Sequence, residues 1–510
     1  MTFSFSSATR VAVIGAGSMG AGIAQLAAQA GHEVRLYDQQ PGAAARALDR
    51  IGADLAGAVQ KGRLTASARD EVLGRLRAAD TLAALEGSGL VVEAIVERLE
   101  PKQALFRELE SLLGDDAVFA TNTSSISVTA IAQGLRRPGR LIGWHFFNPA
   151  TRMKLVEVVC GLATDAALVP AFHALSQAWG KTAVDAPNTP GFIVNRVARP
   201  FYAEGLRLLA ERIAPLAAID RLAREAGGFA MGPFELMDLI GVEVNLSVTE
   251  SVFQATAFDP RFAPHVLQQE MARSGRHGRK SGQGFYDYRD GAAAPQVAAV
   301  APAAAAPLLR VPADANDAGL LAPLVLRLRE AGVALEPDAS LPRETLALAG
   351  VHIALTDGRT AAQRSAEAGG QPLLLLDLAL DFARTPLLGA ATSAQAVPSL
   401  AALAAVLQPA GIALLALDDV AGLVVMRLVA CLANEAADLM TWTPTTAADI
   451  DTAMRLGVNY PAGPLGWADA IGPARVAQVL QHLQHHYGDV RYRRAPLLTR
   501  LQHEEGRFHG

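Results

Sequence analysis

His145 and Glu157 are the two side chains of this sequence best suited to move a proton between them and a substrate. His145 directly follows the apolar run Leu141–Trp144, and Glu157 lies in the next such run, Leu155–Val159. Histidine titrates near neutral pH and acts as a general base, while a carboxylate bonded to it fixes the tautomer and stabilises the imidazolium. Ligands of open α/β sheets bind at the carboxyl ends of strands. His145 is therefore predicted to follow a strand and to face a substrate.

A glycine-rich segment near the N-terminus could bind a dinucleotide. It reads Gly15-Ala16-Gly17-Ser18-Met19-Gly20, between a β-branched run and an Ala-rich helical segment. In such a motif the first glycine permits a tight turn, the second lets the backbone approach a pyrophosphate, and the third allows close helix packing. Asp38 ends the next predicted strand, where a carboxylate binds both ribose hydroxyls and repels a 2′-phosphate. The pattern predicts NAD as cofactor and hydride transfer as the chemistry.

Several domains must position these residues, because 510 residues exceed one ordinary domain. The apolar periodicity predicts an α/β Rossmann-type doubly wound sheet followed by an all-α domain, then a smaller degenerate α/β domain and a second helical domain. The predicted segments are an NAD-binding domain at 1–188, a helical substrate or dimerisation domain at 189–290, an Ala/Pro linker at 291–308, the degenerate α/β domain at 309–415 and the second helical copy at 416–510.

An internal duplication supports this division. Residues 191–241 and 422–472 align without a gap at an offset of 231, and the pairs Ile219-Asp220 and Gly232-Pro233 recur as Ile450-Asp451 and Gly463-Pro464. Asn195 of the first copy is replaced by Met426, which cannot make the hydrogen bonds of an amide. The region 309–415 also contains no G-x-G-x-x-G motif. We therefore expect one active site per chain, in the N-terminal half.

Composition excludes several other classes of function. A net charge of −5 gives no reason to expect nucleic acid or an anionic membrane as partner. The most apolar stretch, 411–433, carries three charged residues and is not predicted to span a membrane. The only two cysteines are far apart in sequence, as in proteins of reducing compartments, and no signal peptide is evident. We expect a cytoplasmic protein without a metal site.

Several motifs together resemble the signatures of the 3-hydroxyacyl-CoA dehydrogenase family. They are Thr121-Asn122-Thr123-Ser124-Ser125, His145-Phe146-Phe147-Asn148-Pro149, Lys154-Leu155-Val156-Glu157, Pro190-Gly191-Phe192-Ile193-Val194-Asn195-Arg196 and the glycine-rich run 278–286. The resemblance covers residues 10–290 and implies oxidation of (S)-3-hydroxyacyl-CoA to 3-oxoacyl-CoA. It implies that His145 is the base, that Glu157 orients it, and that Ser124 and Asn195 bind the substrate oxygens.

The resemblance also implies further contacts with the dinucleotide and coenzyme A. Residues matching Glu97, Lys102, Asn148 and Lys280 lie near the dinucleotide in family members, although Glu97 and Lys102 could instead be a helix-start carboxylate and a solvated lysine. The family places a helical hairpin after the second strand, here 43–76, in which Lys61 and Arg63 are candidate partners of the coenzyme A phosphates.

The two-copy layout resembles the long dehydrogenases of bacterial aerobic phenylacetate catabolism, which oxidise 3-hydroxyadipyl-CoA. A terminal carboxylate on the substrate needs a cation, and Arg152 and Arg196 are candidates. Arg196 recurs as Arg427 in the second copy, and this recurrence favours a structural role for Arg196. Alternatives are a 3-hydroxybutyryl-CoA dehydrogenase, a dehydrogenase of free 3-hydroxyacids and a non-enzymatic NAD-binding protein. The helical copies are expected to pack as an intrachain pseudo-dimer, or the chain to form a homo-oligomer.

Overall fold

The computed structural model describes residues 3–510 and divides the chain into two compact units. The first unit runs to Arg196 and also contains Thr443–Val458, while the second contains Val197–Trp442 and Asn459–Gly510. The chain therefore returns to the first unit for one short segment. No described helix has the length and apolar character needed to cross a membrane.

The first unit is built on an eight-stranded sheet in the order β3-β2-β1-β4-β5-β6-β7-β8. Strands β1 to β6 are parallel, and β7 is antiparallel to β6 but parallel to β8. Almost every residue of β1, β4, β5, β6 and β7 is buried, as expected for strands covered on both faces. The strands are β1 (Val11–Ile14), β2 (Val34–Tyr37), β3 (Leu76–Ala79), β4 (Leu90–Glu93), β5 (Val118–Thr121), β6 (Leu141–Phe146), β7 (Leu155–Val159) and β8 (Thr182–Ala186).

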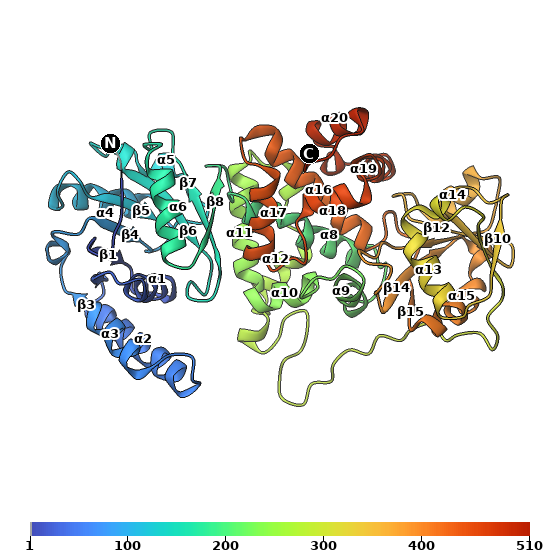
Figure 1. Ribbon diagram of the computed structural model, residues 1–510, viewed down its shortest axis with the longest axis horizontal. Coiled ribbons are helices and arrows are strands. Elements are labelled where there is room, and N and C mark those ends of the chain that lie inside the picture. The colour runs from blue at the N-terminus through green and yellow to red at the C-terminus, as the bar shows by residue number, and fades with distance from the viewer. Residues whose placement is uncertain (1–2) are drawn as a thin grey trace. The chain divides into compact units, whose positions relative to one another are not determined.

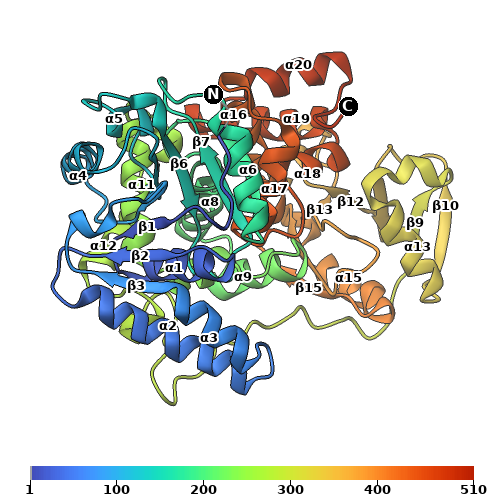
Figure 2. The same cartoon turned by 60° about the vertical axis from the view of Figure 1, so that its left-hand side comes forward.

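Helices connect these strands in the right order for a doubly wound sheet. Figure 2 shows α2 and α3 side by side next to β3, where they form the predicted hairpin. Thr65 begins α3, since its hydroxyl accepts the N–H of Ala68 at 3.2 Å. The helices are α1 (Ser18–Gln29), α2 (Ala43–Gln60), α3 (Ala66–Arg75), α4 (Leu99–Leu112), α5 (Val128–Ile131), α6 (Leu168–Ala178) and α7 (Val194–Val197).

The two helical copies match helix by helix at the offset of 231. The first copy contains α8 (Arg199–Ala210), α9 (Leu216–Glu225), α10 (Pro233–Ile240), α11 (Val242–Ala255) and α12 (Val266–Arg273). The second contains α16 (Val425–Trp442), α17 (Ala447–Gly457), α18 (Pro464–Ile471), α19 (Pro473–Tyr487) and α20 (Pro496–Glu504). Helix α16 is continuous where the first copy has α7 and α8, because Pro200 lacks the N–H that would bond across the junction.

The second α/β domain has a seven-stranded mixed sheet in the order β10-β9-β11-β12-β13-β14-β15 (Figure 1). Its elements are β9 (Leu309–Pro312), α13 (Ala322–Glu330), β10 (Leu335–Asp338), β11 (Thr345–Leu348), β12 (Val351–Leu355), α14 (Ala361–Glu367), β13 (Leu373–Leu376), β14 (Leu387–Thr392), α15 (Ser399–Leu407) and β15 (Ala413–Ala416). Three of these strands were expected at 351–356, 372–376 and 412–417. Residues 292–308, which precede the domain, form neither helix nor strand.

The two α/β domains each receive a helix from the helical copy of the other half. Helix α17, of the second copy, packs against β7 and β8 within the first unit. Helix α9, its counterpart in the first copy, packs against β14 within the second unit. The exchange accounts for residues 443–458 in the first unit, and the packing of α8 against α16 places the first helical copy in the second unit.

Candidate active site

The glycine-rich loop between β1 and α1 has no room for side chains at two of its three glycines. Gly15 has a φ of 101°, and a Cβ there would lie 2.4 Å from the Ala94 carbonyl oxygen. A Cβ on Gly20 would lie 1.8 Å from the Gly15 carbonyl oxygen, whereas one on Gly17 would meet nothing within 4 Å. The loop is therefore tight towards the protein and open outwards, which fits a backbone that a pyrophosphate approaches.

The first turn of α1 is free to bind an anion. No side chain caps its N-terminus at Gly17, and Ser18 is exposed while Met19 is half-buried. Uncapped N–H groups and the helix dipole favour a phosphate at this end. Asp38 lies just beyond β2, and its carboxylate accepts the N–H of Ala16 at 2.7 Å and that of Gln40 at 2.9 Å. The acidic group is thus bonded to the loop itself, at the position expected to bind a ribose.

His145 lies within β6 and not beyond its end, which corrects the sequence-based expectation. Strand β6 extends to Phe146 because β7 pairs with it in antiparallel fashion, and the register places His145 directly opposite Glu157. The imidazole Nδ1 and the Glu157 carboxylate are 2.6 Å apart, and both side chains are buried. Phe147 and Phe192 flank the imidazole ring. The pair is held by strand register and by apolar neighbours.

Glu157 also joins the histidine to the start of α7. Its other carboxylate oxygen accepts the N–H groups of Ile193 and Val194, each at 3.0 Å. Those groups would otherwise be unsatisfied at a helix N-terminus. Asn195 follows in the first turn of α7 and is half-buried. A single carboxylate thus connects the strand that carries His145 with the helix that carries Asn195.

Ser124 lies in a loop that Glu97 organises. One oxygen of Glu97 accepts the N–H of Ser124 at 2.9 Å and the hydroxyl of Thr123 at 2.7 Å. Burial raises the pKa of Glu97, but Lys102 and these hydrogen bonds outweigh it and hold the pKa below its ordinary value. Lys102 is 1% exposed, with Nζ 3.2 Å from Glu97 and 2.6 Å from Glu93. Lys102 is therefore not a solvated lysine, and it fixes Glu97.

Two positioning residues escaped the sequence-based analysis. Glu93 is fully buried at the end of β4 and accepts the hydroxyl of Thr121 at 2.6 Å besides contacting Lys102. Asn122 follows β5, and its side-chain oxygen accepts the N–H of Phe146 at 2.8 Å, next to the histidine. The sequence did contain a signal for each residue: Glu93 is a carboxylate within an apolar run, and Asn122 is an amide directly after one.

A lysine binds the backbone of the loop that follows β6. Its Asn148–Pro149 peptide bond is cis, and Asn148 is exposed. Lys181 donates to the carbonyl oxygens of Ala150 at 2.5 Å and Met153 at 2.7 Å. Burial, together with the charge of Lys154, lowers the pKa of Lys181 to about 8. The loop carries Arg152, which is exposed.

The other predicted contact residues make no hydrogen bond or ion pair with the described residues of this cluster. Lys61 and Arg63 are exposed in the turn between α2 and α3. Lys280 belongs to the second unit, where it forms an ion pair with Glu243. Their expected contacts with coenzyme A and with the dinucleotide stay predictions.

The second half contains a counterpart of the Glu157 arrangement without a histidine. Asp377 follows β13, and its N–H bonds to the Gly389 carbonyl as the next rung of the β13–β14 pairing. Its carboxylate accepts the N–H groups of Val424 and Val425 at 3.1 and 2.7 Å, which are the repeat counterparts of those that Glu157 binds. One aspartate opposite a glycine thus replaces a histidine–glutamate pair.

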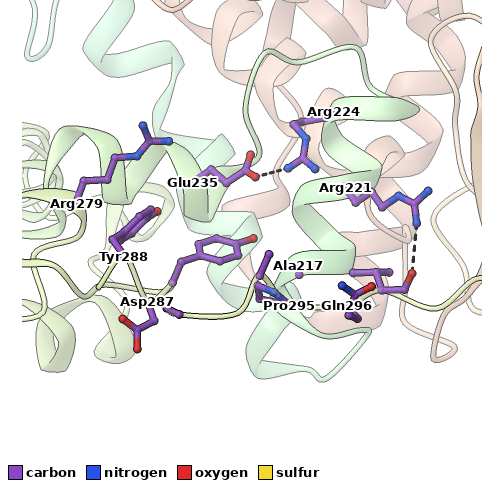
Figure 3. A pocket seen from close by; sticks show the side chains of 13 residues that line it. Ala217, Arg221, Arg224, Glu235, Arg279, Asp287, Tyr288, Pro295 and Gln296 are labelled. Carbon is purple, nitrogen blue, oxygen red and sulfur yellow. Dashed lines mark hydrogen bonds and ion pairs between the residues drawn. The ribbon is translucent and has the colours of Figure 1, made fainter. Parts of the chain in front are cut away.

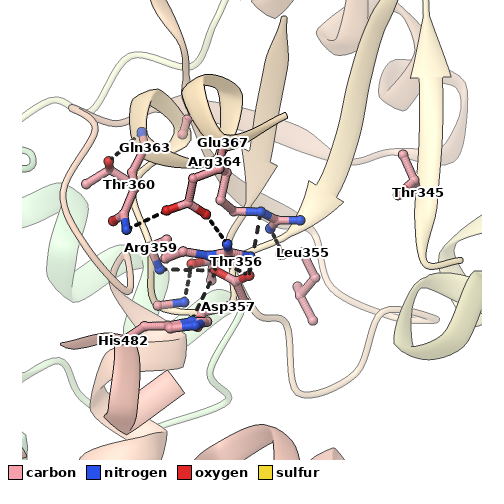
Figure 4. Close-up of polar contacts among 12 residues, drawn as sticks. Thr345, Leu355, Thr356, Asp357, Arg359, Thr360, Gln363, Arg364, Glu367 and His482 are labelled. Carbon is pink, nitrogen blue, oxygen red and sulfur yellow. Dashed lines mark hydrogen bonds and ion pairs between the residues drawn. The ribbon is translucent and has the colours of Figure 1, made fainter. Parts of the chain in front are cut away.

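The carboxyl end of β12 is occupied by a closed network of charges (Figure 4). Asp357 pairs with Arg359 and lies 3.6 Å from Arg364, while His482 Nδ1 is 2.7 Å from the Asp357 carbonyl oxygen. Burial raises the pKa of Asp357, but the hydrogen bond and charge of the arginines outweigh it and hold the pKa low. These groups satisfy one another. Among the described residues, this edge also lacks a glycine-rich loop and a histidine–carboxylate pair like that of His145 and Glu157.

A cavity of about 480 Å³ in the second unit holds none of the predicted site residues (Figure 3). It lies between the first helical copy and the segment after it. Arg224 pairs with Glu235 there, and Arg221 is 2.9 Å from Glu225. These charges are paired with each other, whereas Arg279 lies over the ring of Tyr288, and no acid–base pair of the predicted kind lies among the described residues that line the cavity.

The fold and the site define the class of protein. The strand order, the glycine cradle at an uncapped helix and the acidic residue after β2 are those of a Rossmann-type NAD-binding domain. A buried histidine–carboxylate pair is a group of the kind that can transfer a proton. The residues present therefore fit NAD.

Comparison with known proteins identifies the family. The model "3-hydroxyacyl-CoA dehydrogenase, NAD binding domain" matches residues 10–189, and the corresponding C-terminal domain model matches twice, at 191–288 and 422–509. A "3-hydroxybutyryl-CoA dehydrogenase reduced Rossmann-fold domain" model matches residues 353–420. The chain belongs to the 3-hydroxyacyl-CoA dehydrogenase family and is an NAD-dependent enzyme of this kind. The predicted fold class, with its second helical copy, is confirmed.

Individual relatives are similar over the whole chain or over its first half. The chain is 43% identical to the 3-hydroxyadipyl-CoA dehydrogenase of Escherichia coli K12 over 490 residues, which is 96% of each chain. It is 40% identical over 281 residues to a probable 3-hydroxybutyryl-CoA dehydrogenase of Bacillus subtilis, covering 55% of this chain and 98% of the relative. A crystal structure described as 3-hydroxybutyryl-CoA dehydrogenase from Escherichia coli K12 aligns with a TM-score of 0.88 at 40% identity, covering 98% of this chain and 99% of the other.

Proposed function

We propose that this enzyme oxidises (S)-3-hydroxyacyl-CoA thioesters with His145 as the general base. The observation that carries the proposal is the 2.6 Å contact between His145 Nδ1 and the buried Glu157 carboxylate. A carboxylate accepts a hydrogen bond, so Nδ1 carries the proton and Nε2 keeps its lone pair. Nε2 then takes the proton of the 3-hydroxyl group, and the charge of Glu157 stabilises the imidazolium that forms.

Neutral hydrogen-bond donors complete the proposed site. Ser124 and Asn195 bind the 3-oxygen and the thioester carbonyl without competing for the proton. NAD, held by Gly15, Gly17, Gly20 and the first turn of α1 with Asp38 at the ribose, supplies the hydride acceptor when bound. Removal of the hydroxyl proton by the histidine and loss of a hydride from C3 to that acceptor convert the alcohol to a ketone.

We further propose that the substrate is 3-hydroxyadipyl-CoA, as an intermediate of phenylacetate degradation. Support comes from the relative of that name, which matches 96% of the chain. The ω-carboxylate needs a cation, and Arg152 is exposed on the loop that follows the β6 histidine. Lys61 and Arg63, exposed in the α2–α3 turn, are the proposed contacts of the coenzyme A phosphates.

3-Hydroxybutyryl-CoA is the second candidate substrate. It is favoured by the name of the full-length structural relative with a TM-score of 0.88. The two candidates differ only in the acyl chain, so they share the catalytic residues and differ in the need for a cation.

A panel of thioesters tests the substrate directly. Oxidation of NADH would be followed with acetoacetyl-CoA, 3-oxohexanoyl-CoA and 3-oxoadipyl-CoA, and kcat/KM compared. We expect 3-oxoadipyl-CoA to be preferred over the uncharged six-carbon thioester, and the preference to be lost in Arg152→Ala. A preference for acetoacetyl-CoA would support the second candidate, and no turnover of any thioester would contradict the proposed function.

We also propose that the two helical copies form a pseudo-dimer within one chain. Helices α8 and α16 pack together within the second unit, and the fully buried Arg427 of α16 contacts Glu204 of α8 at 2.7 Å. Arg427 also lies 2.9 Å from Glu211, in the first copy. Charges buried between the copies support a permanent association.

A further inference from the structure

Helix α17 connects the non-catalytic half of the chain to the catalytic strands. It belongs to the second helical copy, yet it lies in the first unit and packs on β7 and β8. Strand β7 carries Glu157. We propose that α17 is a positioning element for the active site of the first half, and that Gly457 is the position at which it acts. The proposal rests on the roles of Glu157 and Asn195 proposed above.

The contact is close enough to exclude even a methyl group. A Cβ on Gly457 would lie 2.9 Å from Leu155 Cδ2 and 2.9 Å from Val194 Cγ2, and real Cβ atoms do not come so near. Leu155 and Val194 are fully or almost fully buried. Neither can move outwards into solvent, so a larger residue at 457 must displace them.

Both contacted residues are next to catalytic groups. Leu155 lies two positions before Glu157, so both side chains project from the same face of β7. Val194 donates its N–H to Glu157 at 3.0 Å and directly precedes Asn195. Displacing Val194 therefore changes the orientation of the Glu157 carboxylate and, through it, that of His145. It also shifts the amide proposed to bind the thioester carbonyl.

In the second unit the glycine is on the strand and not on the exchanged helix. There α9 approaches β14, and a Cβ on Gly389 would lie 2.8 Å from Leu417 Cδ1 and 3.2 Å from Leu222 Cδ1 of α9. Ala226, the counterpart of Gly457, accepts the N–H of Leu380 at 3.0 Å. In each unit a glycine lets the exchanged helix reach the sheet. In the first unit the sheet residues it reaches adjoin the catalytic pair.

Substitution of Gly457 tests the proposal in the full-length enzyme. We expect Gly457→Val to lower kcat for reduction of a 3-oxoacyl-CoA by at least about tenfold, through misplacement of the acid–base pair. The dissociation constant of NADH should stay within about twofold, because the glycine-rich loop lies at β1 and α1. The apparent pKa in the pH profile of kcat/KM should also move, which general loss of stability would not cause.

A compensating substitution and a matched control separate positioning from folding. Val194→Ala removes one of the two side chains that a methyl group at position 457 would meet. We therefore expect the double variant of Gly457→Ala and Val194→Ala to have a higher kcat than Gly457→Ala alone. Gly74→Ala, near the end of α3 where nothing lies within 4 Å, serves as the control and should keep normal kcat.

The outcomes distinguish this proposal from the proposed function. Normal kcat and an unchanged pH profile in folded Gly457→Val would overturn the positioning role, even if His145→Gln is inactive. Parallel loss of kcat, NADH affinity and thermal stability without rescue by Val194→Ala would also overturn it. Normal activity of His145→Gln would instead remove the proposed catalytic pair.

Discussion

Glu157 has two partners at once, and this dual role sets the geometry of the site. One oxygen binds the histidine and the other binds the first N–H groups of α7. An isolated buried carboxylate is costly, and these contacts satisfy it. The residue types at 145 and 157 could be read from the sequence, as could their partnership. The strand register that places them opposite each other could not, because nothing local in the sequence shows that β7 runs antiparallel to β6.

Replacing the histidine tests its role at the smallest scale. His145→Gln keeps a hydrogen-bonding side chain but cannot accept a proton near neutral pH. We expect kcat to fall by about 10²–10⁴-fold while NADH still binds. Steady-state kinetics and NADH fluorescence titration measure the two quantities. The control His173→Gln, on α6, should have the rate of the unmodified enzyme. A near-normal rate for His145→Gln would exclude His145 as the base.

Lys181 predicts a pH dependence of stability. Its pKa of about 8 in the folded protein lies below that of a free lysine, so the unfolded chain binds more protons between about pH 8 and pH 10.4. The free energy of unfolding should therefore rise with pH over this window, relative to Lys181→Met. Urea unfolding of both proteins at pH 7.5 and pH 9.5 measures the difference. A difference that is flat or falls with pH would contradict the lowered pKa.

At the scale of elements, the six inner strands of the first sheet were predicted but its edge strands β3 and β8 were not, and the second sheet was predicted only in part. Strands such as β1, β4 and β5 are short apolar runs bounded by turn residues, and their helices follow at regular distances. In the second domain the two exposed residues of β10 are Glu336 and Pro337, and β14 reads Leu-Leu-Gly-Ala-Ala-Thr. Neither has the β-branched or alternating pattern of a strand. They form because neighbouring strands supply the hydrogen bonds. The residues within β10 and β14 do not by themselves predict that pairing.

The packing of α1 on β1 gives a prediction for cofactor binding. In Gly20→Ala the new methyl group would meet the Gly15 carbonyl oxygen, so helix and loop must separate. We expect the dissociation constant of NADH to rise at least about tenfold, or about 1.4 kcal/mol. Isothermal titration calorimetry measures it. Gly57→Ala in α2, where nothing lies within 4 Å of the new group, is the matched control. Equal affinity of both variants would show that the close approach is not needed.

At the scale of the whole molecule, the duplication was evident in the sequence but its arrangement was not. The offset of 231 shows that two segments share a fold, and says nothing about which sheet each helix contacts. The exchange of α9 and α17 is a matter of tertiary packing between segments more than 160 residues apart. The recurrence of Arg196 as Arg427 favoured a structural role for Arg196, whereas the buried partners of Arg427 could not be predicted from the sequence.

Arg427 gives a prediction for the association of the two helical copies. It contacts Glu204, Glu211, Tyr487 and Tyr492, and is fully buried. Arg427→Met removes the cation paired with Glu211 and leaves Glu204 paired with Arg207, so we expect the free energy of unfolding to fall by about 3 kcal/mol. Urea unfolding followed by circular dichroism measures the loss. Arg384→Met, at an arginine whose side chain is 89% exposed, should change it by less than about 0.5 kcal/mol. Similar stabilities of both variants would contradict a stabilising role of the buried Arg427 contacts.

The exchange of α17 has a consequence for how such an enzyme changes over generations. In an assembly of identical chains, a mutation in a supporting helix appears in every copy, including the one that contributes to the catalytic side. Here residues 447–457 and 216–225 are encoded separately, so the helix packed behind Glu157 varies without altering its twin. The residues of the proposed active site and the helix that supports them can therefore change independently, and the second copy has Met426 where the first has Asn195 while it still carries that helix.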